Sequence, residues 1–265
     1  MTGRHPPLTT HRRLGRGAVI RSGSSSAYRA VEISEGEPHL IRDELAGAGD
    51  RRAGRALFCL VHITDLQLAD VQSPTRFEFL NARFADPRYA EILPVQRPQE
   101  ALTAHAVDAT IRTLGAVHGP ATGLPLQLAV TTGDAIDNAQ WNELQAFLAL
   151  LDGGPVSPDS GGPAYEGVQS PDWPGDVFWR PDGGGRAGPD FFRGEHGFPH
   201  HPGLLRRALR EFTATGLGVP WLSCFGNHEA LNQGVGTQTP GLAAALTGDR
   251  KPVALPEDFD HDGAA

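Results

Sequence analysis

Three apolar runs, each followed at once by a short polar tip, constrain this chain more than any other feature. The runs are Leu57–Thr64, Leu126–Thr132 and Val219–Phe225, and their near-continuous apolar character is typical of strands buried on both faces. Residues 99–117 and the segment that begins at Trp141 instead repeat apolar residues on one helical face. The order β-α-β-α-β predicts an α/β fold with a parallel sheet covered by helices.

The polar tips are expected to meet at one edge of this sheet. Right-handed crossovers bring the carboxyl ends of parallel strands to the same side, where open α/β sheets bind ligands. The tips supply two carboxylates, two carboxamides and an imidazole, from Asp65, Gln67, Asp134, Asn227 and His228. Oxygen and imidazole ligands suit Mn, Fe or Zn, and a carboxylate can bridge two cations about 3.5–4 Å apart for displacement at phosphorus. These tips therefore predict metal-dependent attack on a phosphate group.

The tips also resemble the motifs of a known family, the calcineurin-like metallophosphoesterases. That family is recognised by Asp-x-His, Gly-Asp-x-x-(Asp/Glu) and Gly-Asn-His-(Asp/Glu), followed by two later His-containing motifs. The resemblance implies that Asp65 and Gln67 bind a first metal, that Asp134 bridges two metals and that Asn227 binds the second. It implies a catalytic role for His228, which would orient the scissile phosphate or protonate the leaving oxygen.

The resemblance covers residues 56–232 and sets the expected fold, the β-α-β-α-β half of an αββα sandwich. Asp137 and Glu229 belong to the same motifs and are expected to support the ligand residues without binding metal themselves. A helix cap is the alternative role for Asp137.

Two departures from the family pattern bear on function. Gln67 stands where most of the family has His, as in members similar to the Mn-dependent ADP-ribose/CDP-alcohol diphosphatases. Two Mn ions are therefore the expected cofactors, with Fe or Zn as alternatives. Beyond Glu229 the only histidine is His261, which no Gly precedes, so the later motifs are absent.

The missing motifs leave two hypotheses open. The first is a dinuclear phosphoric ester hydrolase, of which this chain is expected to be the amino-terminal part, with residues 233–265 leading into a carboxyl-terminal half. The second is a truncated, catalytically incomplete fragment or pseudo-enzyme with at most a partial metal site.

The remaining segments carry weaker patterns. Residues 1–55 are expected to be disordered or weakly structured, with Gly36-Glu37-Pro38 as a turn between two short strands. Residues 153–202 are rich in Gly and Pro and predict an irregular insert. Residues 203–216 predict a third helix.

Composition limits the partners. The chain has 23 Lys and Arg against 31 Asp and Glu, a net charge of −8, which argues against a nucleic-acid or anionic membrane surface. A small phosphorylated substrate held by metal ions is the expected partner, and no pattern predicts an oligomeric state. No run approaches the ~20 apolar residues of a membrane span, and Arg12-Arg13 precede no apolar signal region, so a cytoplasmic location is expected.

Overall fold

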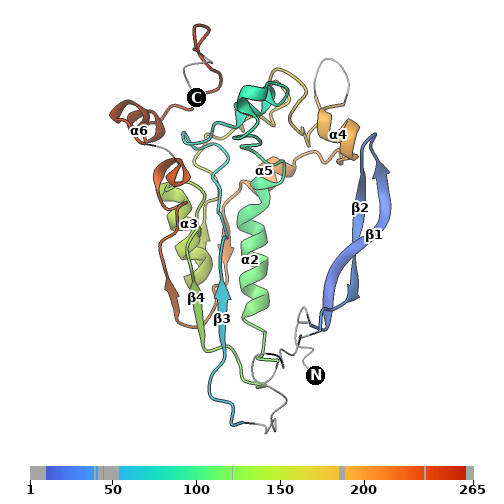
Figure 1. Ribbon diagram of the computed structural model, residues 1–265, viewed down its shortest axis with the longest axis vertical. Coiled ribbons are helices and arrows are strands. Elements are labelled where there is room, and N and C mark those ends of the chain that lie inside the picture. The colour runs from blue at the N-terminus through green and yellow to red at the C-terminus, as the bar shows by residue number, and fades with distance from the viewer. Residues whose placement is uncertain are drawn as a thin grey trace.

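The chain forms a mixed α/β fold built around a small parallel sheet (Figure 1). The computed structural model describes residues 10–38, 40, 44, 54–120, 122–184, 189–235 and 237–260. The sheet consists of β3 (Leu60–Ile63), β4 (Leu128–Thr131) and β7 (Trp221–Ser223), in the order β3-β4-β7. Both pairings are parallel, as the order of strands and helices along the chain predicts.

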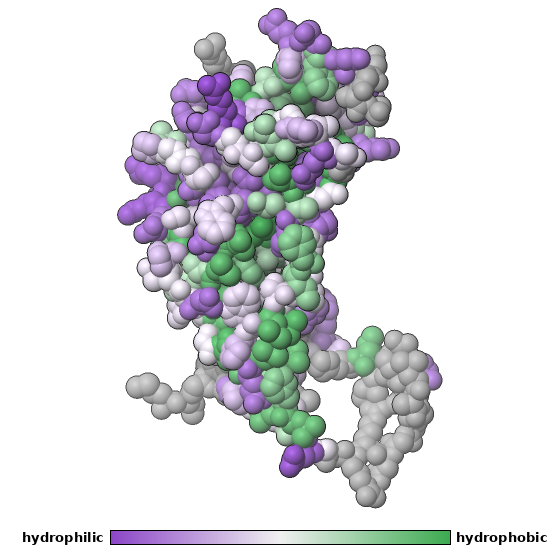
Figure 2. Space-filling model, turned by 90° about the vertical axis from the view of Figure 1, so that its left-hand side faces the viewer, coloured by the Kyte–Doolittle hydropathy of each residue, from purple (hydrophilic) through white to green (hydrophobic). Residues whose placement is uncertain are grey.

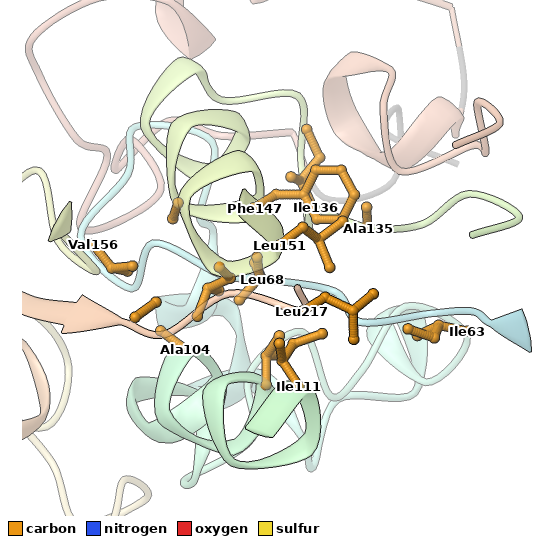
Figure 3. Close-up of a cluster of buried hydrophobic side chains, with 14 of the residues drawn as sticks. Ile63, Leu68, Ala104, Ile111, Ala135, Ile136, Phe147, Leu151, Val156 and Leu217 are labelled. Atoms are coloured by element: carbon orange, nitrogen blue, oxygen red, sulfur yellow. The ribbon is translucent and has the colours of Figure 1, made fainter. Parts of the chain in front are cut away.

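Two helices cover one face of the sheet. They are α2 (Thr103–Leu114) and α3 (Trp141–Asp152), which contact each other. The predicted one-sided apolar pattern is buried in both: Ile111 of α2 and Phe147 and Leu151 of α3 point into a shared core with Leu217 (Figure 3). Residues on this face of the strands, such as Ala129, are part of the same core.

The opposite face of the sheet is largely open in the described part of the chain. Leu60 and Leu222 on this face are 51% and 62% exposed. His62 is also exposed and forms a hydrogen bond with Thr132 Oγ1 at 2.7 Å. Hydrophobic residues accordingly gather along the narrow lower part of the surface, where Figure 1 places the strands (Figure 2).

The N-terminal segment differs from the sequence prediction. β1 (Arg12–Ser22) and β2 (Ala27–Glu35) form an antiparallel hairpin, which reaches α4 (Phe191–His196) at its upper end (Figure 1). The turn lies at residues 23–26, not at Gly36–Pro38. The backbone N–H groups of Ser25 and Ser26 donate to Glu195 O at 2.9 Å, a long-range contact that no local pattern reveals. The expectation of disorder or weak structure is therefore wrong for residues 12–35, while residues 1–9 lie outside the described part.

The third predicted helix is much shorter than expected. α5 (Leu204–Ala208) ends after five residues, and β6 (Phe212–Ala214) follows it. β6 pairs antiparallel with β5 (Gly154–Val156), and the Phe212 ring stacks on His105 of α2 at 4.5 Å. These tertiary contacts outweigh the helical pattern of residues 209–216.

The Gly/Pro-rich insert contains two short elements, β5 and α4, and the segment between them has buried side chains of its own. Phe178, Trp179 and Arg180 are all at most 5% exposed, and Arg180 pairs with Asp176 at 3.0 Å. The remaining elements are short: η1 (Glu78–Arg83), η2 (Pro87–Tyr89), η3 (Glu100–Leu102), η4 (Leu231–Gly234) and α6 (Pro240–Leu246). Among the described residues, no helix has the length and apolar character needed to cross a membrane.

Candidate functional site

The loops that follow β3 and β4 run side by side. The backbone N–H of Asp65 donates to Gly133 O at 3.3 Å, and that of Gln67 donates to Asp134 O at 2.9 Å. Beyond them, Leu68 and Ile136 form a further parallel bridge. These backbone bonds place the first two polar tips next to each other, as the parallel topology requires.

Three of the predicted ligand residues have a backbone conformation that side-chain-bearing residues rarely adopt. The φ angles of Asp65, Gln67 and Asp134 are +56°, +45° and +51°. A non-glycine residue in this region costs on the order of 1–3 kcal/mol, and such residues cluster at functional sites. Backbone hydrogen bonds between the two loops stabilise this unfavourable conformation. The three residues that adopt it are ones that the sequence predicts to be metal ligands.

The third tip, after β7, contacts the second. A side chain at Gly226 would collide with Asp134 Oδ1, so the close approach of the two loops requires glycine there. The backbone N–H of His228 donates to the same Asp134 Oδ1 at 3.0 Å. The tips of β4 and β7 therefore meet at the carboxylate that is predicted to bridge two metals.

The imidazole of His228 is held in one tautomer. Its Nδ1 lies 2.7 Å from the backbone carbonyl oxygen of Asp137, so Nδ1 must carry the proton and donate it. The Asp137 carboxylate adds electrostatic support, with Oδ1 3.7 Å from Nδ1. Nε2 is then the ring nitrogen left to exchange a proton with a ligand.

The two expected supporting residues both contact predicted site residues. Glu229 accepts hydrogen bonds from the backbone N–H groups of Asp134, Ala135 and Gly226 at 2.6–3.0 Å. Asp137 touches His228 and also forms an ion pair with Arg76. Both residues thus fix the backbone around the tips.

Asn227 is the fourth predicted ligand, and its side-chain amide is anchored at one end. Nδ2 donates to Gln233 O at 2.9 Å, which leaves Oδ1 available as a ligand oxygen. Asp65, Gln67 and Asp134 provide the oxygen donors that a hard divalent cation prefers. For a second cation, the predicted set offers Asp134 and Asn227.

The predicted donor set contains two carboxylates and two amides. Among the described residues, no group of three or more His, Cys, Asp or Glu side chains is placed to hold a metal ion.

Arg76 is a site residue that the motifs do not reveal. Its guanidinium is 5% exposed and donates to the carboxylates of Asp137 and Glu100. Burial alone would lower the pKa of Arg76, but nearby carboxylates, Glu100 and Asp137 foremost, outweigh burial and raise it. Arg76 comes from the loop before η1, which has no periodic pattern or motif to signal such a role.

Glu143 is a second residue that sequence reasoning missed. It lies in the first turn of α3, is 2% exposed, and accepts 2.9 Å hydrogen bonds from the backbone N–H groups of Asp70 and Asn138. Burial raises the pKa of Glu143 to about 7. The only sequence signal was an acidic residue at a helix start, which also occurs for ordinary helix stability.

A cavity of about 250 Å³ opens beside the tips. Gln67, Asp137 and His228 line it together with Arg76 and Arg97. The predicted site therefore adjoins a space large enough for part of a small organic ligand.

Comparisons with models of protein families, with curated proteins and with solved structures found no match to this chain.

Proposed function

We propose that this chain is a metal-dependent phosphoric ester hydrolase of the calcineurin-like metallophosphoesterase type. One observation carries the proposal: the three motif-bearing tips adjoin one another at one edge of a parallel sheet, with Asp134 in contact with the other two. The strand order and the open sheet face are also what one half of an αββα sandwich would have. The substrate would be a small phosphorylated compound.

In this proposal Asp65, Gln67 and Asp134 would hold a first cation, and Asp134 and Asn227 would contribute ligands to a second, with Mn²⁺ preferred. When bound, such cations offset the charge of the phosphate and favour deprotonation of the attacking water. The protein positions the ligand oxygens through the strained loop backbone and through Glu229.

His228 is the proposed catalytic residue. With Nδ1–H donated to the Asp137 carbonyl, a proton on Nε2 can pass to the leaving oxygen while the ring keeps its orientation. The Asp137 carboxylate forms a buried ion pair with Arg76. This ion pair fixes the residue whose backbone carbonyl accepts the hydrogen bond from His228.

The test is hydrolysis of 4-nitrophenyl phosphate and bis(4-nitrophenyl) phosphate with and without Mn²⁺. Asp134→Asn should lower turnover by at least about 100-fold and weaken Mn²⁺ binding, because a neutral amide cannot bridge two cations. Asp172→Asn, which changes an exposed carboxylate in the insert, is the matched control and should have no effect. Unchanged turnover in Asp134→Asn would refute the bridging role.

The alternative is a catalytically incomplete phosphoesterase fold with a partial metal site. The sequence feature that favours it is the lack of the two later His-containing motifs, since His261 is the only histidine beyond Glu229. Mn²⁺ binding that Asp134→Asn weakens, without turnover of either ester, would select this alternative over the hydrolase.

A further inference from the structure

The cavity beside the candidate site has a second region that the proposed chemistry does not use. Beyond Gln67 and His228, its lining includes Phe77, Ile92, Pro94, Val95 and Arg97. We call the cavity the Arg97 pocket. The lining of this cavity is mainly polar, and its apolar part, which we call the apolar wall, consists of Phe77, Ile92, Pro94 and Val95. Arg97 and the proposed phosphate site border the same cavity.

The apolar wall is held in place by buried hydrogen bonds. Asn81, which is 7% exposed, accepts from the backbone N–H of Val95 at 2.9 Å and donates to Gln96 O at 3.0 Å. Both bonds fix the segment that forms the wall. The wall is therefore a preformed surface, as ligand pockets usually are.

The two arginines that line the pocket have different roles. Arg76 donates to Asp137 and Glu100, so its charge is already paired. Arg97 lies with Nη1 3.8 Å from Glu100 Oε1, which is beyond hydrogen-bond distance, and its side chain is 63% exposed. Its N–H donors are thus available to an anionic group.

The exposed charge of this pocket comes from Arg97. The charged residues that line the pocket are Arg76, Arg97 and Asp137, and Glu100 pairs with Arg76 beside it. Because Asp137 and Glu100 balance the two arginines, the attraction of a further anionic group depends on the exposed Arg97 guanidinium.

We propose that the Arg97 pocket binds the organic group of the substrate, and that Arg97 selects phosphate compounds with a second anionic group. The ligand class is an organic phosphate with an apolar ring or chain, followed by a carboxylate or a further phosphate. Arg97 is a specificity-determining residue in this view. The inference rests on the proposed phosphoesterase function, which supplies the site for the first phosphate.

The experiment measures binding of three phosphonates, whose C–P bond resists ester hydrolysis, by titration calorimetry with Mn²⁺ present. Phenylphosphonate has one anionic group, 4-phosphonobenzoate adds a carboxylate, and 1,4-phenylenediphosphonate adds a second phosphonate. The unmodified chain should bind at least one of the doubly anionic ligands roughly tenfold more tightly than phenylphosphonate. The tighter of these two identifies the preferred second anion.

Arg97→Ala should remove this preference, and Arg97→Lys should keep part of it, since lysine retains the charge without the planar fork. Arg112→Ala is the matched control, because Arg112 is also exposed but pairs with Asp108 on α2 and does not line the pocket. Ile92→Asp changes a wall residue that is already 54% exposed, and should weaken all three ligands about fivefold or more without unfolding the chain.

Equal affinity of the unmodified chain for all three ligands would overturn this inference while leaving the phosphoesterase proposal standing. A preference that survives Arg97→Ala would do the same. Binding of none of the three would overturn both, because the first phosphonate would then have no site.

Discussion

Glu143 and Glu229 each join two of the three loops that form the candidate site. Glu143 joins the loop after β3 to the loop after β4, through the backbone N–H groups of Asp70 and Asn138. Glu229 joins the loop after β4 to the loop after β7, through Asp134, Ala135 and Gly226. Two acidic side chains thus connect all three tips through hydrogen bonds from backbone N–H groups.

The buried position of Glu143 predicts a pH dependence of stability. Its pKa is raised from 4.5 to about 7 in the folded chain, so the folded state binds a proton that the unfolded state releases between these values. The stabilisation by this proton is complete below pH 4.5 and is lost as pH rises through 7. We expect the free energy of unfolding to fall by up to about 3 kcal/mol from this group between pH 4.5 and pH 8.

Chemical denaturation at several pH values checks this expectation. Glu143→Gln is neutral throughout, so it should be less stable at low pH, because it loses one acceptor, and should show a flatter pH profile. Glu166→Gln, at an exposed position, serves as the control. An unchanged slope in Glu143→Gln would contradict the assignment.

At the scale of elements, the contact between the hairpin β1–β2 and α4 joins segments that are 170 residues apart. The hairpin turn approaches α4 so closely that a side chain at Gly23 would overlap the backbone of Glu195. The side chains of Ser25 and Ser26 add hydrogen bonds to Glu195 and His196.

Gly23→Val should detach the hairpin from α4 and leave the sheet intact. Limited proteolysis should then cut residues 12–35 several-fold faster, with little change in the melting temperature of the remainder. Gly194→Ala is the control, because a side chain at Gly194 of α4 meets open space. Equal protease resistance of Gly23→Val and the unmodified chain would show that this contact does not hold the hairpin.

At the scale of the whole molecule, the open face of the sheet dominates the expected behaviour in solution. Each large apolar side chain left exposed forgoes roughly 1.5–3 kcal/mol of burial, against a net domain stability of about 5–15 kcal/mol. Contiguous apolar patches of this kind favour association. Cys224, which is also exposed, provides a chemical probe near this face.

We expect the chain made alone to self-associate and to bind a hydrophobic dye. Replacing Leu60 and Leu222 together by threonine, which suits strands, should reduce both effects without lowering the melting temperature. Ile111→Thr on the covered side should instead destabilise the fold by about 2–4 kcal/mol, because Ile111 is 0% exposed. Light scattering and dye fluorescence provide the measurements, and a monodisperse unmodified chain without dye binding would contradict this expectation.

Local sequence patterns predicted the parallel sheet, its two covering helices and the meeting of the tips at one edge. Ile111 and Phe147 lie on the buried face that their spacing predicts, because helical periodicity is a local property. The tips after β3, β4 and β7 meet because the handedness of the crossovers leaves one arrangement of parallel strands. Both inferences need only the residues of an element and the order of the elements.

How the site is held and what lies beside it depend on contacts between distant segments. Arg76 pairs with Asp137, which lies 61 residues further along the chain. Phe212 lies in a strand and stacks on His105, although its sequence pattern predicts a helix. Arg97 becomes part of a pocket because Asn81 holds the neighbouring wall. Such contacts depend on which loops come together after folding. Loop residues have no periodic sequence pattern that predicts their contacts, because groups distant in sequence position the backbone there.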